Sequence, residues 1–243
     1  MATSEHSAKL AARHQLYREL ASGVSGLLLA LFMFGHTLLV GSILTGTAGF
    51  DWVALTLEIY FIAQPTVVII LALFLLHAFY AGRKIPARIR ERRRMIDVGK
   101  NLAASGRTSE IAHAESMLWI WQVRTGLLIL VLGSFHIGLI ALDVLTPLFG
   151  ERAGIEAATT LARERAGLWI VYAILTVCIA FHTAVGLYRL AVKWGAGSRF
   201  SRRTMRGMER IILWGMLGLG ALTLLVMAGV IPPPLAGLIG GVR

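Results

Sequence analysis

Four histidines lie singly inside four separate apolar segments of this 243-residue chain: His36, His77, His136 and His182. An ionisable side chain within a hydrocarbon layer is costly, so such residues are rare in membrane helices and mark functional sites by default. Imidazole is also a common axial ligand of haem iron. Four ligands, one from each of four helices, would serve two bis-histidine haems, so the pattern predicts a membrane cytochrome b with two b-type haems. A haem-free protein whose histidines pack or relay protons is the alternative.

The elements that must carry these histidines are long apolar helices. The chain is 56% hydrophobic and only 15% charged, which exceeds the apolar content of an ordinary soluble domain. Crossing a hydrocarbon core of about 30 Å takes about 20 apolar residues in a helix. We therefore expect an all-α polytopic membrane protein in which the whole chain, 1–243, forms one membrane domain and the first four helices form a haem-binding bundle. The predicted spans are 22–45, 61–81, 118–142, 167–192 and 211–231.

The positions of the Lys and Arg residues indicate which ends of these spans face the cytoplasm. The formal net charge is +11, and most of the 24 Lys and Arg residues fall in three tracts, 9–18, 83–107 and 189–210. An odd number of spans places these tracts on one face, which the positive-inside rule makes cytoplasmic. The distribution thus predicts that the N terminus lies inside and the C terminus outside, and it disfavours nucleic acid as the partner. No cleavable signal peptide is evident, because residues 1–21 form a polar tail, expected to be cytoplasmic.

The basic loop 82–117 is expected on the cytoplasmic face. It contains IPARIRERRRMIDVGK, which either contacts lipid headgroups or docks soluble partner subunits. A short amphipathic surface helix is expected in this loop, before the third span.

Depth along the helices sorts the histidines into two pairs. At a rise of about 1.5 Å per residue, His36 and His136 lie roughly 20–24 Å from the cytoplasmic boundary. His77 and His182 lie only about 9–10 Å from it. One haem between spans one and three and another between spans two and four would form an electron path across much of the bilayer.

Several other cofactor classes are excluded by residue types. Cys178 is the only cysteine and there is no Cys-x-x-Cys-His, so this chain alone builds no covalent c-type haem and no iron–sulfur cluster. Gly35, Gly41, Gly133, Gly138 and Gly186 lie near the histidines, where they either leave room for a macrocycle or allow plain helix contact.

Around the four histidines the sequence resembles a known family. The stretches are LFMFGHTLLVGSILTG, LLHAFYAGRKIP, LWIWQVRTGLLILVLGSFH and HTAVGLYRLAVKWG. They are similar to the di-haem cytochrome b membrane subunit of quinol:fumarate reductases and related succinate:quinone oxidoreductases.

The resemblance implies that His77 and His182 bind the proximal haem and His36 and His136 the distal haem, in agreement with the depths. It further implies that Trp119 and Lys193 contact propionates of the proximal haem, with Ser22 in a plausible position to join them. From the residues alone we add Arg124, since a cation about one turn inside the membrane needs an anionic partner. Snorkelling of Arg124 to headgroups is the alternative.

A glutamate between the first two spans of the family helps to bind menaquinol and to accept its protons, and Glu58 occupies that place. The alternative is that Glu58 is an exposed interfacial carboxylate without a role in quinol chemistry. Some members carry a second glutamate two residues before the fourth ligand, proposed to return protons across the membrane. Ala180 stands there in this chain, so either protons take another route or turnover moves net charge.

The expected function is therefore that of a membrane anchor which oxidises menaquinol near the outer side. It would pass electrons through the two haems to a cytoplasmic iron–sulfur subunit and an FAD-containing flavoprotein that reduces fumarate, within a dimer of heterotrimers. The alternatives are a succinate:quinone reductase working in the opposite direction and a cytochrome b of another membrane dehydrogenase. The sequence leaves direction, quinone type and haem potentials open.

Overall fold

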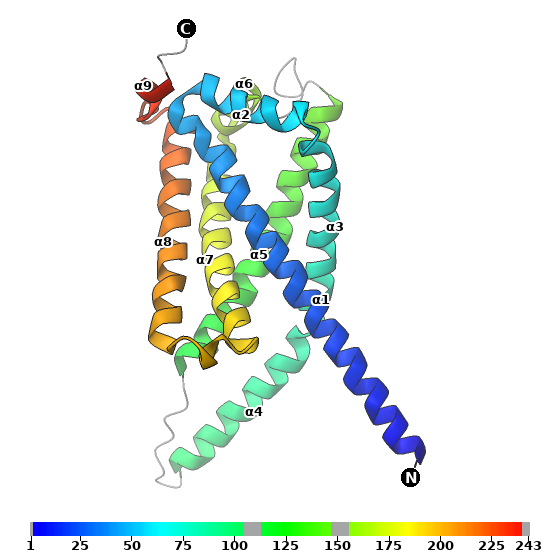
Figure 1. The fold of residues 1–243 in the computed structure, drawn as a ribbon. Helices are drawn as coiled ribbons and strands as arrows, with labels where there is room; N and C mark the ends of the chain where they lie inside the picture. The colour runs from blue at the N-terminus through cyan, green and yellow to red at the C-terminus, as the bar shows by residue number, and fades with distance from the viewer. Residues whose placement is uncertain (1, 105–112, 147–155, 240–243) are drawn as a thin grey trace.

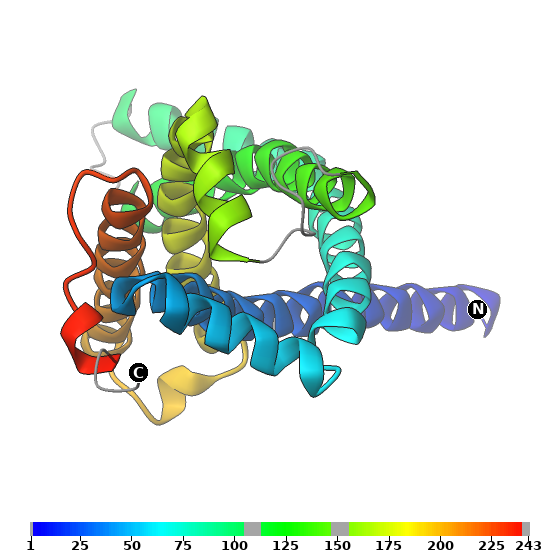
Figure 2. The same cartoon turned by 90° about the horizontal axis from the view of Figure 1, so that it is seen from above.

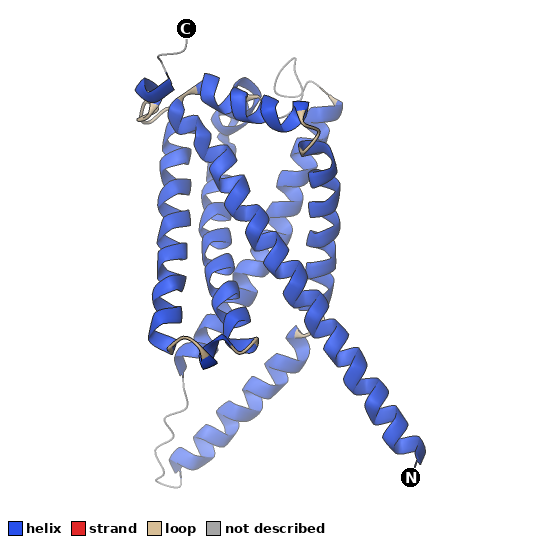
Figure 3. Ribbon diagram, in the orientation of Figure 1, coloured by secondary structure: helices blue, strands red, loops and turns tan. Residues whose placement is uncertain are grey.

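The structure is a computed structural model that describes residues 2–104, 113–146 and 156–239. These residues form helices joined by turns, and no strand occurs among them (Figure 3). The predicted all-α class is confirmed. In chain order the elements are α1 (Ala2–Gly41), η1 (Ser42–Thr45), α2 (Thr47–Ile59), α3 (Ala63–Gly82), α4 (Ile85–Ala104), α5 (His113–Leu145), α6 (Ala157–Arg163), the π-helical turn η2 (Glu164–Leu168), α7 (Trp169–Lys193), η3 (Ala196–Ser198), α8 (Arg202–Met227) and α9 (Ala236–Ile239).

Five segments are long and apolar enough to cross a membrane, and they contain α1, α3, α5, α7 and α8. The predicted number of spans is thus confirmed. Many of their apolar side chains face outward: Val67, Val68 and Ile69 of α3 are 55–69% exposed. In a bilayer such side chains meet lipid tails rather than water, so exposure here is compatible with a stable fold.

The spanning helices pack in a definite order of neighbours. α1 packs against α3, α5 against α7, and α7 against α8. α1 crosses the bundle obliquely in Figure 1, and the view along the bundle in Figure 2 shows it running from beside α8 towards α3; it contacts α8 and α7 as well as α3. The helices that carry the four histidines are therefore the first four spans, and α8 supports α7 from the other side.

Helix ends differ from the predicted spans because capping residues set them. α8 begins at Arg202, well before the predicted 211, with Ser201 as its N-cap: the Ser201 side chain accepts a hydrogen bond from the Thr204 N–H at 3.1 Å. It ends at Met227 rather than 231, because Gly229 adopts φ +73° and prolines follow. The predicted fourth span starts at Gly167, but that glycine has φ +96° and α7 begins only at Trp169.

Two helices project from the same end of the bundle (Figure 1). The N-terminal tail was expected as a polar segment outside the first span, yet α1 runs continuously from Ala2 through it. Residues 2–22 hold no Gly or Pro and are rich in good helix formers, which accounts for the continuation. The surface helix expected in the loop 82–117 is α4, and its 20 residues make it longer than predicted. We call the end of the bundle from which α1 and α4 project the inner end.

The opposite, outer end is closed by α2, which lies across the bundle near α6 (Figure 1). Asp51 of α2 accepts a hydrogen bond from the N–H of Ala157 at 2.7 Å, so it satisfies the first turn of α6. Beneath it lies a buried apolar cluster from η1, α2, α6 and α8. Its members are Ile43, Leu44, Phe50, Ala54, Ala157, Val226 and Met227. This cluster holds η1, α2, α6 and α8 together at the outer end.

Candidate functional site

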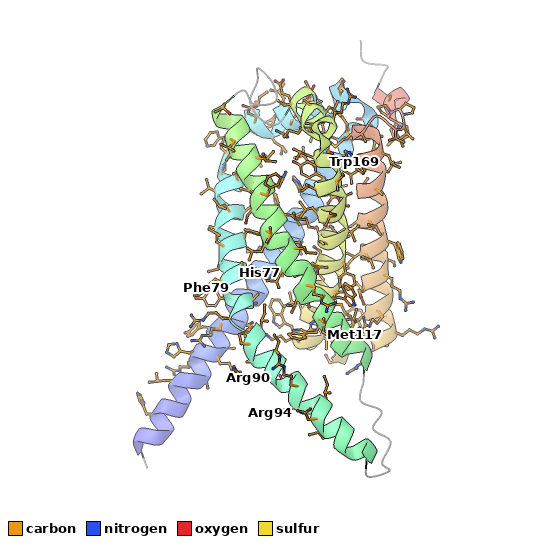
Figure 4. The ribbon with its side chains drawn as sticks, turned by 180° about the vertical axis from the view of Figure 1, so that it is seen from behind. His77, Phe79, Arg90, Arg94, Met117 and Trp169 are labelled. Atoms are coloured by element: carbon orange, nitrogen blue, oxygen red, sulfur yellow. The ribbon has the colours of Figure 1, made fainter. Side chains whose placement is uncertain are left out.

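The four histidines of the spans meet as two pairs. His36 of α1 and His136 of α5 form the outer pair, with ring centroids 6.3 Å apart and ring planes at 61°. His77 of α3 and His182 of α7 form the inner pair, with centroids 6.4 Å apart and planes at 90°. Figure 4 shows His77 towards the inner end, from which α4 projects, while Trp169 marks the outer start of α7. These are the pairs that the depths along the helices predict.

The spacing within each pair fits a metal held between two imidazoles. Rings that bind one metal from opposite sides at about 2 Å have centroids about 6 Å apart, close to both observed separations. Among the residues that the structure describes, no three His, Cys, Asp or Glu side chains converge on one point. The donor sets are therefore two imidazoles each, as an axially ligated haem iron requires. The histidines of each pair therefore fit a haem iron with two axial imidazole ligands.

Each inner histidine is held by a main-chain carbonyl of a neighbouring helix. Nδ1 of His77 lies 3.1 Å from the carbonyl oxygen of Ser22, and Nδ1 of His182 lies 3.0 Å from that of Gln122. A carbonyl can only accept, so Nδ1 carries the proton in both rings. This tautomer leaves the lone pair of Nε2 free for a metal. These two acceptors come from the neighbouring helices α1 and α5.

A hydroxyl and a glycine also lie against each inner histidine. We call the carbonyl, hydroxyl and glycine that surround one ring its seat. Ser25 Oγ lies 3.3 Å from Nδ1 of His77, and Thr125 Oγ1 lies 3.4 Å from Nδ1 of His182. A Cβ added to Gly26 would come within 2.8 Å of Cε1 of His77, and one added to Gly126 within 2.9 Å of Cε1 of His182. Such distances are shorter than an ordinary van der Waals contact of about 3.5–4.0 Å. Only glycine leaves room for the rings at these two positions.

The same arrangement therefore occurs twice. On α1 and again on α5, a carbonyl is followed three residues later by a hydroxyl and one residue after that by glycine, and a histidine of the next spanning helix sits on it. Sequence reasoning missed both seats. The recurrence of Ser25-Gly26 and Thr125-Gly126 in two spans, each preceding a histidine-bearing span, is the signal that could have found them.

The outer pair is supported differently. Nδ1 of His136 lies 3.2 Å from the hydroxyl of Tyr172 on α7, and the two rings meet edge to face at 5.4 Å. His36 stacks on Phe32 of its own helix, with centroids 5.4 Å apart and planes at 22°. A phenol thus occupies the place that a backbone carbonyl takes at the inner pair. Tyr172 was not among the predicted site residues.

Comparisons with known proteins place the chain in a family. Residues 101–227 match the succinate dehydrogenase/fumarate reductase transmembrane subunit family. The chain belongs to this family. Its spans three to five lie inside the match, with His136 and His182, and the resemblance drawn from the sequence is confirmed. With five apolar helices, the chain is an integral membrane protein.

Individual relatives carry more specific names. The chain is 33% identical over 179 residues to the fumarate reductase cytochrome b subunit of Wolinella succinogenes, a match that covers 70% of this chain and 64% of that protein. It is 30% identical over 200 residues to the fumarate reductase cytochrome b subunit of Helicobacter pylori strain J99, covering 79% of this chain and 71% of that protein. The match to the first relative thus spans less than two thirds of its length.

The remaining predicted site residues lie at both ends of the bundle. Ser22 meets His77 through its carbonyl, while Lys193 pairs with Glu19 of α1. Arg124 is exposed, with its guanidinium 5.2 Å from the centroid of the Trp121 ring, a cation–π contact on the outside of α5. Whether Arg124 pairs with a propionate or reaches lipid headgroups stays a prediction.

Two further predicted residues are placed by the structure. Trp119 of α5 is half-buried near the inner end, and Glu58 is exposed close to the end of α2 at the outer end. Their roles toward propionates and quinol stay predictions.

The glycines predicted near the histidines divide by what surrounds them. A Cβ on Gly35 or Gly138 would meet nothing within 4 Å, and both residues are exposed, so neither glycine is required for a close contact. A Cβ on Gly41 would touch Leu219 of α8 at 3.3 Å, and one on Gly186 would touch the Gln122 amide at 3.1 Å. The last two therefore serve close helix contact, and the glycines that abut imidazoles are Gly26 and Gly126.

Proposed function

We propose that this chain is the di-haem cytochrome b subunit of a quinol:fumarate reductase and that it carries electrons from menaquinol to soluble partner subunits. The observation that supports this most strongly is the pair of bis-imidazole sites, with centroids 6.3 and 6.4 Å apart, between four membrane helices. The family and the names of the relatives add independent support.

The chain's own residues would hold two b haems. His36 and His136 would ligate one iron and His77 and His182 the other, each through Nε2. A haem bound there supplies one-electron transfer between ferrous and ferric iron. The carbonyls of Ser22 and Gln122 fix the inner ring planes and raise the basicity of these ligands. The apolar helix faces keep water away from both sites.

Two haem sites at different depths would form a route for electrons through the membrane and would not themselves transform a substrate. The inner pair lies on helices whose inner ends continue into α4 and η3, and the outer pair lies nearer α2 and α6. Electrons that enter at the outer pair would thus leave at the inner pair, next to the projecting helices. In this account the chain supplies the quinol half-reaction and no fumarate chemistry.

Glu58 is the proposed proton acceptor of menaquinol oxidation. Oxidation of a quinol releases two protons with its two electrons, so a carboxylate at the outer end is a suitable base. Glu58 lies at the end of α2, just before the turn in which Phe61 adopts φ +55° and the chain enters α3. The carboxylate is exposed there and accessible from the outer side.

The inner end would face the cytoplasm and the partners. The exposed Arg90, Arg93 and Arg94 of α4 and Arg13 and Arg18 of α1 lie on the two projecting helices. By the positive-inside rule this end is cytoplasmic, with the C terminus outside, in a bacterial inner membrane. The proposed partners there are an iron–sulfur subunit and an FAD flavoprotein, assembled as a dimer of heterotrimers.

Three of the predicted residues, Trp119, Lys193 and Ser22, stand at the inner end as proposed propionate contacts of the inner haem.

A Glu58→Gln variant tests the role of Glu58 as the proton acceptor. The variant keeps the shape of the side chain but cannot accept a proton, so menaquinol-dependent fumarate reduction by the assembled complex should fall by about 10²–10⁴-fold, with both haems retained. Asp51→Asn on the same helix is the matched control for charge loss at the outer end. Activity of Glu58→Gln close to that of the unchanged complex would exclude this role. A complex that oxidises succinate but never reduces fumarate would assign the opposite direction.

A further inference from the structure

Two hydroxyl groups are buried beside the inner histidines, in spans that are otherwise mostly apolar. Ser25 of α1 is 2% exposed and Thr125 of α5 is 9% exposed. Oγ of Ser25 lies 3.3 Å from Nδ1 of His77, and Oγ1 of Thr125 lies 3.4 Å from Nδ1 of His182. Each inner histidine therefore has one buried hydroxyl next to the ring nitrogen that faces away from the metal position.

The direction of each hydroxyl is set by its own helix. The Ser25 hydroxyl donates to the carbonyl oxygen of Ala21 at 2.6 Å, and the Thr125 hydroxyl donates to that of Trp121 at 2.8 Å. Serine and threonine often make such bonds to the residue four positions earlier in a helix. The carbonyl that holds the histidine is the more distant one, at 3.4 Å in the first seat and 3.1 Å in the second. Since a hydroxyl has one proton, only its lone pairs remain for the imidazole.

The Nδ1 proton of each ring is therefore shared between two acceptors. The carbonyl oxygen of Ser22 lies 3.1 Å from Nδ1 of His77, and that of Gln122 lies 3.0 Å from Nδ1 of His182. The hydroxyls, which lie slightly beyond the usual 2.7–3.2 Å range, form the longer branch of each bond. Both carbonyls belong to helix main chains and cannot come closer unless the helix moves. A carbonyl alone therefore does not replace a hydroxyl that has been removed.

We propose that Ser25 and Thr125 are positioning residues of the inner haem: their hydroxyls help to hold both axial rings in the tautomer that binds iron, and they lower the reduction potential of that haem. The inference rests on the proposed function and adds two side chains to the carbonyls already described. Ser25 acts on His77 and Thr125 acts on His182. Two separate side chains should thus shift the potential of one iron in the same direction, although neither touches the iron.

The sign of the shift follows from the direction of the hydroxyls. Each turns the negative end of its dipole towards the ring, because its proton points to a helix carbonyl. An accepted hydrogen bond makes the imidazole more basic and favours ferric haem, which carries one more positive charge than ferrous haem. Removal of a hydroxyl should therefore favour ferrous haem. Within the described part of the chain, these hydroxyls bond only main-chain carbonyls and imidazoles, so no charged side chain is released by the change.

Paired substitutions separate the hydroxyl from the size of the side chain. Ser25→Ala and Thr125→Val each remove a hydroxyl and keep nearly the same volume. Ser25→Thr and Thr125→Ser keep the hydroxyl, and each copies the residue that the other seat already has. Thr37→Val on α1 is the matched control, because the Thr37 hydroxyl donates to the Met33 carbonyl at 2.7 Å in the same manner without an imidazole partner among the described residues.

Optical redox titration of the purified full-length protein, after a haem count, measures the effect. The component that disappears on replacement of His77 identifies the inner haem. A neutral hydrogen bond changes an equilibrium by about twofold to tenfold, and only the part that differs between ferric and ferrous haem counts here. At a fixed potential, Ser25→Ala and Thr125→Val should each raise the ratio of reduced to oxidised inner haem about twofold to threefold, which is about 20–30 mV for one electron.

The remaining variants have equally definite expectations. The combined Ser25→Ala and Thr125→Val variant should shift the inner potential upwards by about the sum of the single shifts. The two exchange variants and Thr37→Val should leave the inner potential unchanged. The outer haem should keep its potential in every variant of Ser25 and Thr125, since these residues contact only the inner pair.

The exchange variants distinguish an effect of the hydroxyl from an effect of packing. Two bound haems with an unchanged or lower inner potential in Ser25→Ala and Thr125→Val would overturn the proposal, as would equal shifts in the exchange variants. Loss of the inner haem from the removal variants alone would support positioning by the hydroxyls, whereas its loss from the exchange variants too would overturn it. Unsubstituted protein without haem would instead refute the proposed function, which the count records before any titration.

Discussion

The glycine seats give the sharpest structural prediction. Gly126→Ala adds a methyl group 2.9 Å from Cε1 of His182, and Gly26→Ala adds one 2.8 Å from Cε1 of His77. Since carbon atoms in contact stay about 3.5–4.0 Å apart, either ring must move by roughly 0.6–1.2 Å or its helix must shift. Overpacking of this kind costs about 1–3 kcal/mol. We expect this cost to fall on the histidine and so on retention of the inner haem.

The expected loss can be set against the opposite effect of helix propensity. Alanine in a helix interior is favoured over glycine by about 1 kcal/mol, so the fold itself should not weaken for that reason. At 1.4 kcal/mol per tenfold, the steric cost corresponds to inner-haem retention about fivefold to 150-fold weaker. Gly207→Ala on α8 is the matched control, because a Cβ there meets nothing within 4 Å.

Haem counted per chain, with spectra that distinguish the two haems, is the assay. Both seat variants should lose or perturb the inner haem and leave the outer one intact, while Gly207→Ala should retain both. Two unperturbed haems in Gly126→Ala and Gly26→Ala would refute the reasoning. Loss of the outer haem in these variants would refute the assignment of the seats to the inner pair.

Two other predictions concern the outer pair and the capping of α8. With iron on Nε2 of His136, Nδ1 carries the proton and the Tyr172 hydroxyl accepts it. Tyr172→Phe removes this acceptor and makes the ligand less basic, so the outer haem should stay bound and its potential should rise by a few tens of mV in a redox titration. An unchanged outer potential would contradict this. Ser201→Ala removes the N-cap of α8 at a cost of about 1 kcal/mol. The thermal midpoint of the purified protein should therefore fall by about 2–4 °C. An unchanged midpoint would show that the cap contributes nothing to stability.

Hydropathy predicted the spans well and their ends poorly, for a physical reason. The length of an apolar run follows from the thickness of the hydrocarbon layer, so five runs gave five helices. The ends follow from local hydrogen bonding, such as the Ser201 side chain on the Thr204 N–H and the left-handed Gly229. These lie outside or at the edge of the apolar windows. The helical course of residues 2–22 depends on propensity, which a hydropathy argument does not weigh.

The two histidine pairs could be predicted, whereas their supports could not. Depth depends only on the helix rise and on where the charges begin, both of which the sequence contains. The seats on α1 and α5 depend on which helices are neighbours, and that emerges only from packing. The hydroxyl of Tyr172 and the carboxylate of Glu19 meet their partners across helix contacts of the same kind.

The most direct test of the central claim is the haem content of the purified chain, measured as a pyridine haemochrome together with the dithionite-reduced minus oxidised spectrum. The account predicts two b-type haems per chain, with replacement of His36 and of His136 removing one and the same haem and replacement of His77 and of His182 removing the other. A helical but haem-free protein would contradict it and would assign the two ring pairs to edge-to-face packing, whose centroid separations are about 4.5–7 Å.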